Sequence, residues 1–289
     1  MAKWVVFDAL NLAFRCFYAI PELTRNDGFP TNALHGWVRS LWRVSDEYAP
    51  KNSVVVFDVG EDKRKKELLP EYKEHRKEMP EALAAQLPYL KESAALMGLR
   101  TVELSETEAD DLIATLAARL TGQGDEVFIV SADKDLAQCV NSNVRILLPP
   151  PTARAKAGWT VLDEKGVEDK YGVPPSGIAD LLALVGDTSD NIPGLAGVGP
   201  KTAAKWLREY GDIEEIISNA GTLSPRRFRE QVGEKKEELR RNLKLTRLRR
   251  DLELPGFEEH RADPEGLIAF LEKMEMKGAL ADAKKRYLR

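Results

Sequence analysis

The spacing of apolar and polar positions predicts an alternation of strands and helices in the first part of the chain. Four short, β-branched stretches have the pattern of buried strands: WVVFDAL (4–10), SVVVFDV (53–59), EVFIVSAD (126–133) and VRILLPP (144–150). Helical periodicity separates them, most clearly over 32–48, 79–98 and 106–120. This order predicts an α/β fold with a mostly parallel central sheet flanked by helices.

The strand pattern disappears in the second part of the chain, where short helices alternate with glycine and proline turns. PSGIADLLALVGD predicts one helix that ends at Gly186, and GPKTAAKWLREYG predicts another that begins at Pro200. We therefore expect two domains, an α/β domain over 1–174 and an all-helical domain over 175–289. The helical domain contains a helix-hairpin-helix at about 178–210.

Composition excludes several classes of protein. The 289 residues are 43% hydrophobic and 31% charged, and no stretch approaches the roughly 20 apolar residues of a membrane helix. The N-terminal apolar run is broken by Asp8, Asn11 and Arg15, which argues against a signal peptide. Cys16 and Cys139 are too few for a disulfide framework. We expect a cytoplasmic monomer without a membrane partner.

Net charge by itself gives no sign of a nucleic-acid partner. The formal charge is -4, but its distribution is uneven, and 225–251 is the most basic stretch of the chain.

Aspartates stand where three of the predicted strands end. Asp8, Asp58 and Asp133 would all lie at the carboxyl edge of a parallel sheet, where open α/β sheets bind their ligands. Aspartate is poorly suited to strands and costly to bury without a partner. These positions therefore indicate a site rather than a structural role.

Further acids are predicted to reach the same edge. They come from ETEADD, SADKD and GDTSDN and are Glu108, Asp110, Asp111, Asp135, Asp187 and Asp190. Each group has an ordinary alternative when taken alone. Ser105 with Glu108 fits a capping box at a helix start, and the other acids fit turns and loops. Their convergence on one edge favours a common site.

Carboxylates without nearby histidine or cysteine indicate a hard divalent cation, Mg²⁺ or Mn²⁺. Two such ions, roughly 3.5–4 Å apart, stabilise the attacking and leaving oxygens of a phosphoryl displacement. Neutralisation by lysine and arginine is the competing explanation for the crowded acids. Lys134 alone is too little for it.

A basic stretch follows Asp58, over about 60–82. Its acids nearly balance its bases, so a solvated surface helix is an open alternative to a function. The functional interpretation is a mobile, largely helical arch beside the metals. In it Tyr72 stacks on a base, while Lys73 and Arg76 contact the scissile phosphate.

The stretch GVGPKTA predicts a contact with a nucleic-acid backbone. Gly197 and Gly199 permit a tight turn between two helices. The second helix then begins near Lys201 and Thr202, with free N–H groups available to a phosphate. Such elements hold the backbone without reading bases.

With these motifs in place, the chain resembles the bacterial and phage 5′ nucleases, the flap endonuclease family that includes the N-terminal domain of DNA polymerase I. The resemblance runs from about residue 3 to residue 255. It depends on these motifs: FDALNLAFRCFYA, LPEYKEHR, EADDLIATLA, SADKDLAQ and GDTSDNIPGLAGVGPKTA.

The resemblance implies a site and its cofactors. One divalent ion would be held by the first five of the family's ligands, here Asp8, Asp58, Glu108, Asp110 and Asp111. The second ion would be held by Asp133, Asp135, Asp187 and Asp190. The active-site lysine matches Lys73, the arch tyrosine Tyr72 and the arginine after the first motif Arg15. A potassium ion bound by backbone carbonyls of the hairpin is also implied.

Two positions depart from the family's usual residues. Arg64 and Lys65 stand where Phe-Arg is usual, so an arginine contact of the arch becomes a lysine contact or shifts by one residue. Ala9 follows Asp8 in place of glycine.

The sequence thus predicts a Mg²⁺-dependent, structure-specific 5′ nuclease that cuts DNA at 5′ flaps, nicks and gaps by a two-metal mechanism in replication and repair. RNA primers annealed to DNA are a further candidate substrate. Both a stand-alone nuclease and the front of a polymerase fit the chain.

Three other classes of protein were weighed against this prediction. A catalytically impaired module that binds DNA junctions predicts lost carboxylates, and a PIN-type ribonuclease would lack the hairpin domain. An aspartyl-nucleophile phosphatase needs a DxD motif at the first strand, where Ala9 and Leu10 follow Asp8.

Overall fold

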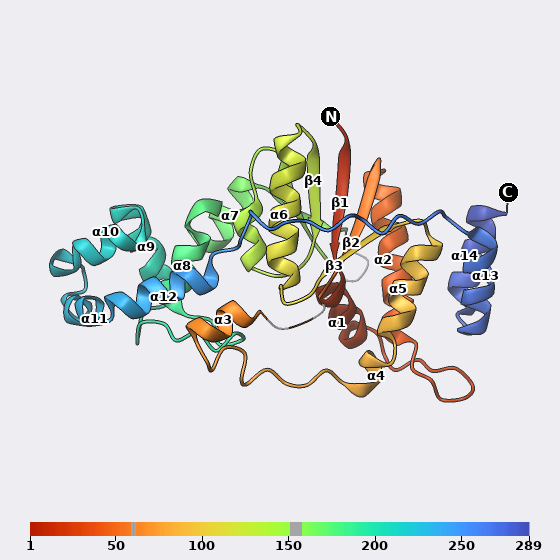
Figure 1. The fold of residues 1–289 in the computed structure, drawn as a ribbon, viewed down its shortest axis with the longest axis horizontal. Coiled ribbons are helices and arrows are strands. Elements are labelled where there is room, and N and C mark those ends of the chain that lie inside the picture. The colour runs from red at the N-terminus through yellow and green to blue at the C-terminus, as the bar shows by residue number, and fades with distance from the viewer. Residues whose placement is uncertain (59, 61, 151–157, 289) are drawn as a thin grey trace.

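The structure is a computed structural model that describes residues 1–58, 60, 62–150 and 158–288. A twisted sheet occupies the centre of an elongated molecule (Figure 1). A group of short helices extends from one side of the sheet, and α13 and α14 lie on the opposite side (Figure 1).

The sheet has six strands in the order β3-β2-β1-β4-β5-β6. All neighbouring strands are parallel except β5 and β6, which are antiparallel. Their bounds are β1 Lys3–Asp8, β2 Asn52–Asp58, β3 Arg100–Leu104, β4 Glu126–Val130, β5 Val144–Leu148 and β6 Thr160–Leu162. The predicted parallel α/β architecture is confirmed.

Alternating side chains give the sheet two cores. In β1, Val5 and Phe7 pack with α1 and α2, whereas Val6 packs with α6 on the other face. Both faces are buried, which explains why these strands are apolar at successive positions. One face carries α1 (Ala9–Ala19), α2 (Asn32–Tyr48), α4 (Glu81–Ala84) and α5 (Leu87–Leu96), and the other carries α6 (Ala109–Gly122).

Two strands and one helix break were not foreseen. The edge strand β3 mixes Arg100 and Glu103 with its apolar residues, and β6 has only three residues, so neither shows a buried-strand pattern. The single helix predicted over 79–98 is wrong, because it divides into α4 and α5. Between them lies the buried Gln86, whose side chain bonds the start of α2, and Pro88 stands in the first turn of α5.

The helical unit begins after β6. Its α-helices are α7 Glu164–Tyr171, α8 Ile178–Val185, α9 Pro200–Tyr210, α10 Ile213–Ser218, α11 Arg229–Glu234 and α12 Lys236–Thr246. The predicted helix-hairpin-helix corresponds to α8, its following loop and α9. Gly186 and Gly211 end these two helices, as the sequence indicates.

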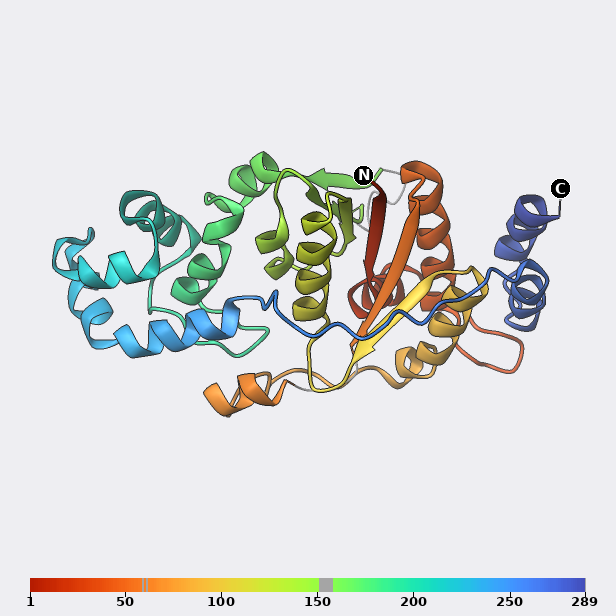
Figure 2. The same ribbon diagram turned by 45° about the horizontal axis from the view of Figure 1, so that its top comes forward.

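The last two helices differ from the sequence-based division into 1–174 and 175–289. α13 (Pro264–Lys273) and α14 (Lys277–Tyr287) join the core of α1, α2 and α5 rather than that of the helical unit. Leu267 and Leu271 supply the apolar face that requires this packing, and both are fully buried. An extended segment, 247–263, carries the chain across the molecule to reach them (Figures 1 and 2).

The predicted arch at about 60–82 is less helical than expected. It contains α3 (Lys63–Leu68), a turn, and an extended stretch that leads to α4. Leu69 ends α3 in an extended conformation, immediately before Pro70, because the residue before a proline disfavours the helix. The segment passes below the carboxyl ends of the strands (Figure 1).

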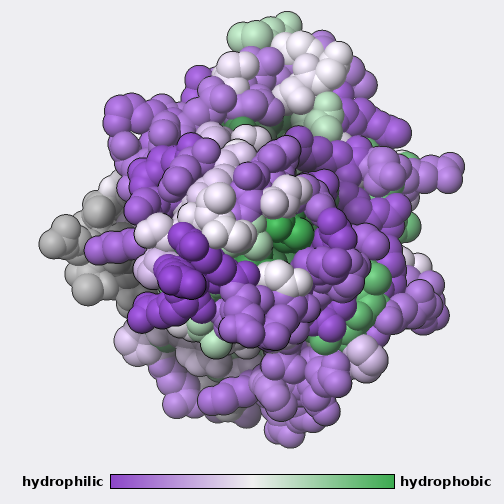
Figure 3. All heavy atoms as spheres, turned by 90° about the vertical axis from the view of Figure 1, so that its left-hand side faces the viewer, coloured by the Kyte–Doolittle hydropathy of each residue, from purple (hydrophilic) through white to green (hydrophobic). Residues whose placement is uncertain are grey.

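No helix of the described residues is long and apolar enough to cross a membrane. Seen from the end formed by the helical unit, the surface is mainly hydrophilic, with a small hydrophobic area near its centre (Figure 3).

A close backbone approach after α8 gives a test of the fold. At Gly186 φ is +80°, and an added Cβ would lie 2.4 Å from the nitrogen of Gly194. Gly186→Ala should therefore lower the free energy of unfolding by roughly 2–3 kcal/mol, measured by urea denaturation. Gly122→Ala is the matched control, because an added Cβ there meets nothing within 4 Å. Equal stability of the two variants would contradict this account.

Candidate active site

The carboxyl edge of the sheet gathers acids from separate stretches of the chain. Asp8 ends β1 and Asp58 ends β2, while Asp133 lies shortly after β4. Because the three strands are adjacent and parallel, their ends meet at one place. The predicted convergence of these three residues on one edge therefore matches the geometry.

Asp8 is buried and held by its neighbours. Its carboxylate accepts a hydrogen bond of 2.8 Å from the Ser131 hydroxyl and one of 3.2 Å from the Asn11 backbone. Burial, with the charges of Asp133 and Asp110, raises the pKa of Asp8 to about 7, although the two hydrogen bonds oppose the change. The metal-free carboxyl group therefore favours its protonated form.

Glu108 stands at the N-cap of α6, but its side chain does not cap that helix. It accepts hydrogen bonds from Lys65 at 2.5 Å, from Tyr72 at 3.0 Å and from Lys73. The capping box considered for Ser105 and Glu108 is wrong, because the helix begins at Ala109 and the glutamate points to the arch. Burial opposes ionisation, yet the charges of Lys65 and Lys73 lower the pKa of Glu108 to about 2.

The next acids follow on the first turn of α6. Asp110 lies 3.8 Å from the ammonium group of Lys65. Asp111 is fully buried, and its Oδ1 accepts a bond of 2.7 Å from the Arg249 backbone N–H. Burial raises the pKa of Asp111 to about 6, although the charge of Lys65 opposes it.

A second group of acids forms beside the first. Asp135, Asp187 and Asp190 bring one carboxylate oxygen each within 4.8 Å of one another, an arrangement that could hold a metal ion. Burial and the charge of Asp133 raise the pKa of Asp135 well above its usual value. Asp187 is the exception, since Lys134 at 2.8 Å lowers its pKa against the effect of burial.

Three buried carboxylate oxygens lack a hydrogen-bond partner among the described residues. They are Oδ1 of Asp58, Oδ2 of Asp111 and Oδ1 of Asp135. Buried polar atoms are normally paired, and an ion that the coordinates do not contain is one reason for an exception. Both acidic groups offer oxygen donors alone, so the residues present fit hard divalent cations.

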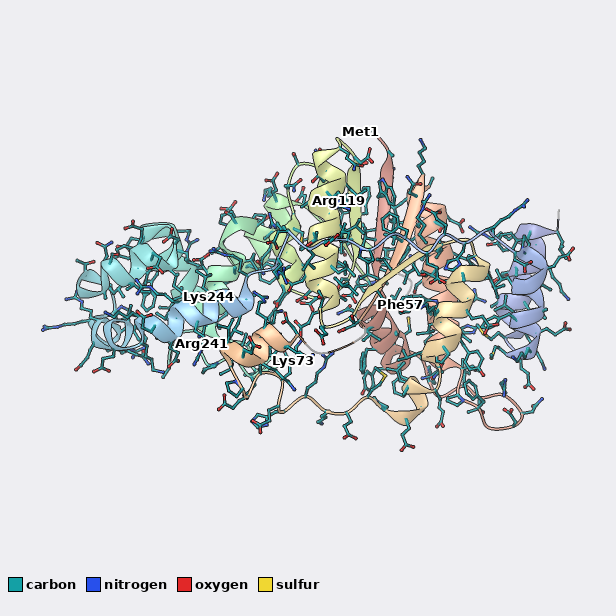
Figure 4. All side chains as sticks on the ribbon, in the orientation of Figure 1. Met1, Phe57, Lys73, Arg119, Arg241 and Lys244 are labelled. Atoms are coloured by element: carbon teal, nitrogen blue, oxygen red, sulfur yellow. The ribbon has the colours of Figure 1, made fainter. Side chains whose placement is uncertain are left out.

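Two adjacent cavities open onto the acids. One of about 280 Å³ is lined by Asp8, Asp58, Glu108, Asp110 and Asp133, together with Lys73 and Arg76. The other, of about 350 Å³, adds further cations of the arch, Lys66 and Lys77. Acids and basic side chains therefore line the same space. Figure 4 labels Lys73 beside α3.

The turn of the arch is bonded to the loop that carries Asp190. The Lys73 backbone N–H donates to the Asp190 carbonyl at 3.0 Å, and Asn191 donates to the Glu71 carbonyl at 2.8 Å. Lys73 has a φ of +57°, an uncommon conformation for a residue with a side chain. These bonds hold Lys73 between the two acidic groups.

The structure corrects the sequence-based view of how the acids are neutralised. Lys134 was considered alone, but Lys65 and Lys73 also contact acids of the cluster. Cationic neutralisation therefore accounts for Glu108 and Asp187. Burial still raises the pKa values of Asp8, Asp111 and Asp135, so cationic side chains do not neutralise these three acids.

Two side chains predicted to contact nucleic acid are buried and bonded to acids of the protein itself. Tyr72 is 2% exposed, and its hydroxyl donates to Asp190 as well as Glu108, so its ring is not available to stack on a base. Lys65 is also 2% exposed and faces acids rather than solvent. Arg64, by contrast, is 39% exposed and lies 3.6 Å from Asp111.

Arg15 lies apart from the acids. Its guanidinium donates to the Pro150 carbonyl, and it lines a separate cavity of about 760 Å³ with Trp42 and Trp159. Among the described residues, no hydrogen bond, ion pair or shared cavity joins Arg15 to the other predicted site residues.

The predicted hairpin residues stand at the start of α9. Gly197 has a φ of +75°, which a turn of this kind requires, and Gly199 is the N-cap. Lys201 is exposed and Thr202 is half-buried. No side chain caps this helix, and the Thr202 N–H donates to the Gly199 carbonyl at 3.0 Å. Within the described residues, Lys201 therefore carries the N–H of the first turn that is left for a ligand.

Three contributors to the site were missed from the sequence. Ser131 bonds both Asp8 and the Asp133 backbone, and its place in SADKD, next to the acids, could have indicated it. The Arg249 backbone and the inward direction of Lys65 depend on tertiary packing. No local pattern marks them.

Comparison with known proteins agrees with this fold. Residues 3–172 match the family model described as 5′-3′ exonuclease, N-terminal resolvase-like domain. Residues 173–265 match the 5′-3′ exonuclease, C-terminal SAM fold.

The chain belongs to the 5′-3′ exonuclease family. It is 38% identical to a 5′-3′ exonuclease of Aquifex aeolicus over 289 residues, which cover 99% of this chain and 96% of the relative. It is also 38% identical to the thermostable DNA polymerase I of Thermus thermophilus, covering 94% of this chain but 32% of the polymerase. The chain thus spans about a third of its polymerase relatives.

Solved structures share the fold. A structure of T5 5′-exonuclease with bound divalent zinc ions matches 99% of this chain and 98% of its own, with a TM-score of 0.70 and 23% identity. The catalytic core of Rad2 in complex with DNA substrate matches 100% of this chain and 92% of its own, with a TM-score of 0.64 and 17% identity.

The buried Asp8 predicts a pH dependence of the metal-free protein. Its pKa is raised from 3.8 to about 7, so its contribution to stability is complete below pH 4 and is lost as the pH rises through 7. In EDTA, Asp8→Asn should reduce the fall in the free energy of unfolding between pH 4 and 7. Each pH unit corresponds to about 1.4 kcal/mol per proton. Urea denaturation at several pH values measures this.

The exposed Asp169→Asn variant is the control for this experiment and should keep the wild-type pH profile. An unchanged profile in Asp8→Asn would show that other groups cause the dependence.

Proposed function

We propose that this chain is a Mg²⁺-dependent, structure-specific 5′ nuclease that hydrolyses DNA phosphodiesters at 5′ flaps, nicks and gaps in replication and repair. RNA primers annealed to DNA are proposed as further substrates. The family membership supports the reaction class, and the site supports the dependence on a hard divalent ion.

One observation carries the proposal. Carboxylates from the ends of β1 and β2, the start of α6, the segment after β4 and the loop after α8 gather at one edge, and several keep buried oxygens without partners. Crowded carboxylates are stabilised by protons, cationic side chains or metal ions, and a metal ion would pair the oxygens that remain without partners.

The two acidic groups would hold one Mg²⁺ ion each. Asp8, Asp58, Glu108, Asp110 and Asp111 form the first group, and Asp133, Asp135, Asp187 and Asp190 form the second. Bound there, two ions would stabilise negative charge on the attacking and leaving oxygens of the phosphodiester.

The arch would supply cations to the substrate. Lys73 and Arg76 line both cavities together with the acids, where a phosphate bound in this space would meet them. Positive charge fixed at this place stabilises the charge that develops on the phosphoryl oxygens. Arg64 and, after a rearrangement of the arch, Lys65 and Tyr72 are the further proposed contacts with the nucleic acid.

The hairpin would hold the duplex part of the substrate. The N–H groups of Gly199 and Lys201 at the start of α9, with the hydroxyl of Thr202, would bind backbone phosphates without reading sequence. The turn at Gly197 would place backbone carbonyls around the proposed K⁺ ion. Contact with the duplex at one end and with a single strand at the arch would select junctions. We propose that the protein acts as a monomer.

Cleavage of matched oligonucleotides tests substrate and cofactor. With Mg²⁺, a 5′-flap duplex should be cut much faster than the nicked duplex without a flap or the single strand, because it engages both hairpin and arch. EDTA should abolish cutting of all three substrates. Gel analysis of end-labelled products measures the rates. Equal cutting of the three, or cutting in EDTA, would reject the proposal.

Asp135→Asn tests the role of the second acidic group. It should lower the flap-cleavage rate by at least about 100-fold, since a charged ligand of the site is replaced by a neutral one. Junction binding, measured by fluorescence anisotropy, should stay within a few fold. Asp135 suits this test because its Oδ1 has no partner to lose.

Asp169→Asn, at an exposed acid of α7, should leave both quantities at their wild-type values. Loss of binding and cleavage together in Asp135→Asn would instead mean that the acid maintains the fold. Wild-type protein that binds junctions but never cuts them would favour the impaired binding module.

A further inference from the structure

Lys65 is a lysine enclosed by the acids that the first metal ion would need. Its ammonium group lies 2.5 Å from Oε2 of Glu108 and 3.8 Å from Oδ2 of Asp110. Its side chain is 2% exposed, so water does not screen these contacts.

The local structure of α3 fixes this placement. Asp62 caps the helix, and its carboxylate accepts a hydrogen bond of 3.1 Å from the backbone of Lys65. The ammonium group also lies 5.7 Å from the centre of the Tyr72 ring. Lys65 is thus directed inward by its own helix and by the turn that follows.

The ammonium group stays charged at this place. Lysine is ordinarily protonated at neutral pH, and carboxylate oxygens of Glu108 and Asp110 within 3.8 Å favour its ammonium form. A permanent positive charge therefore already neutralises part of the first acidic group.

A divalent ion at the first group would compete for the same oxygens. Mg²⁺ binds carboxylate oxygens at about 2.0–2.1 Å and requires near-octahedral geometry. An ammonium group bonded to Glu108 occupies one of the lone pairs such an ion would use. The two cations would also repel each other strongly in a buried space.

We propose that Lys65 is a built-in counter-cation of the first acidic group, whose ammonium must leave Glu108 and Asp110 before a divalent ion can bind both. This inference rests on the metal-dependent function proposed above. It extends that function by coupling metal binding to the position of α3, because Lys65 is part of this helix.

Metal binding at the first acidic group would affect the position of the arch through Lys65. Release of Lys65 removes a contact that holds α3 against the acids, while Lys73 remains bonded through its backbone to the loop of Asp190. The arch could then move at α3 without losing its attachment at the turn. Loading of the first ion would thereby change the entrance that a flap must pass.

The test compares Mn²⁺ binding to wild type and Lys65→Met by isothermal titration calorimetry without DNA. Methionine keeps the length and apolar stem of lysine but removes the competing charge. We expect the affinity of one site for Mn²⁺ to be about tenfold higher in the variant. This factor corresponds to the free energy of one charge-assisted contact. The rise in Tm caused by Mn²⁺ should also be larger than in wild type.

Lys63→Met is the matched control, because it removes the same charge from the same helix. Lys63 is 71% exposed and pairs with Glu106, outside the predicted ligands. The affinity of the Lys63→Met variant for Mn²⁺ should equal that of wild type. Equal or weaker binding by Lys65→Met would overturn the proposal.

A second variant keeps the test decisive if circular dichroism shows that Lys65→Met is unfolded. Lys65→Arg retains the charge and can bond two carboxylates at once, so it should bind Mn²⁺ several-fold more weakly than wild type. Unchanged affinity in Lys65→Arg would then overturn the proposal.

The outcomes separate this inference from the proposed function. Wild-type protein that binds no divalent ion would reject the metal-dependent function and this inference together. Wild-type binding with no change in Lys65→Met would reject the role of Lys65 alone.

Discussion

Electrostatic repulsion among carboxylates at one edge of a sheet is the constraint on which the rest of the structure depends. Parallel strands place their ends together, and here β1 and β2 end in aspartates while Asp133 lies shortly after β4. The protein offsets part of the repulsion with Lys65, Lys73 and Lys134, and part by raising the pKa of buried acids such as Asp8. The carboxylate oxygens that remain unpaired can bind a divalent ion.

Packing of the helical unit completes this edge. Asp187 and Asp190 belong to the loop after α8, which Asn242 of α12 fixes by donating hydrogen bonds to the carbonyls of Ala183 and Pro193. The hydrophobic core on the α6 face continues into α8, α9 and α12. Arg241 and Lys244 lie on α12 as well (Figure 4). The second acidic group therefore depends on the position of the helical unit as well as on the sheet.

The sequence predicted the parts of the molecule that have a local pattern. Buried strands such as β1 and β4, with the acids that follow them, show a run of apolar residues and a polar stop. The edge strand β3 was missed because Arg100 and Glu103 face partly to solvent, and β6 is too short for any period. Lys65 and Tyr72 were predicted to contact the nucleic acid, because nothing in a basic stretch shows which side chains turn inward. Acids far away in the chain determine which of these side chains turn inward.

The segment from 247 to 263 has a role besides connecting α12 with α13. It passes along the outer side of β3, where Thr101 and Glu258 exchange backbone hydrogen bonds (Figure 2). An uncovered edge strand presents unpaired donors and acceptors to other molecules and promotes aggregation. A truncation that removed this segment would thus expose the sheet to self-association, even with every acidic ligand still in place.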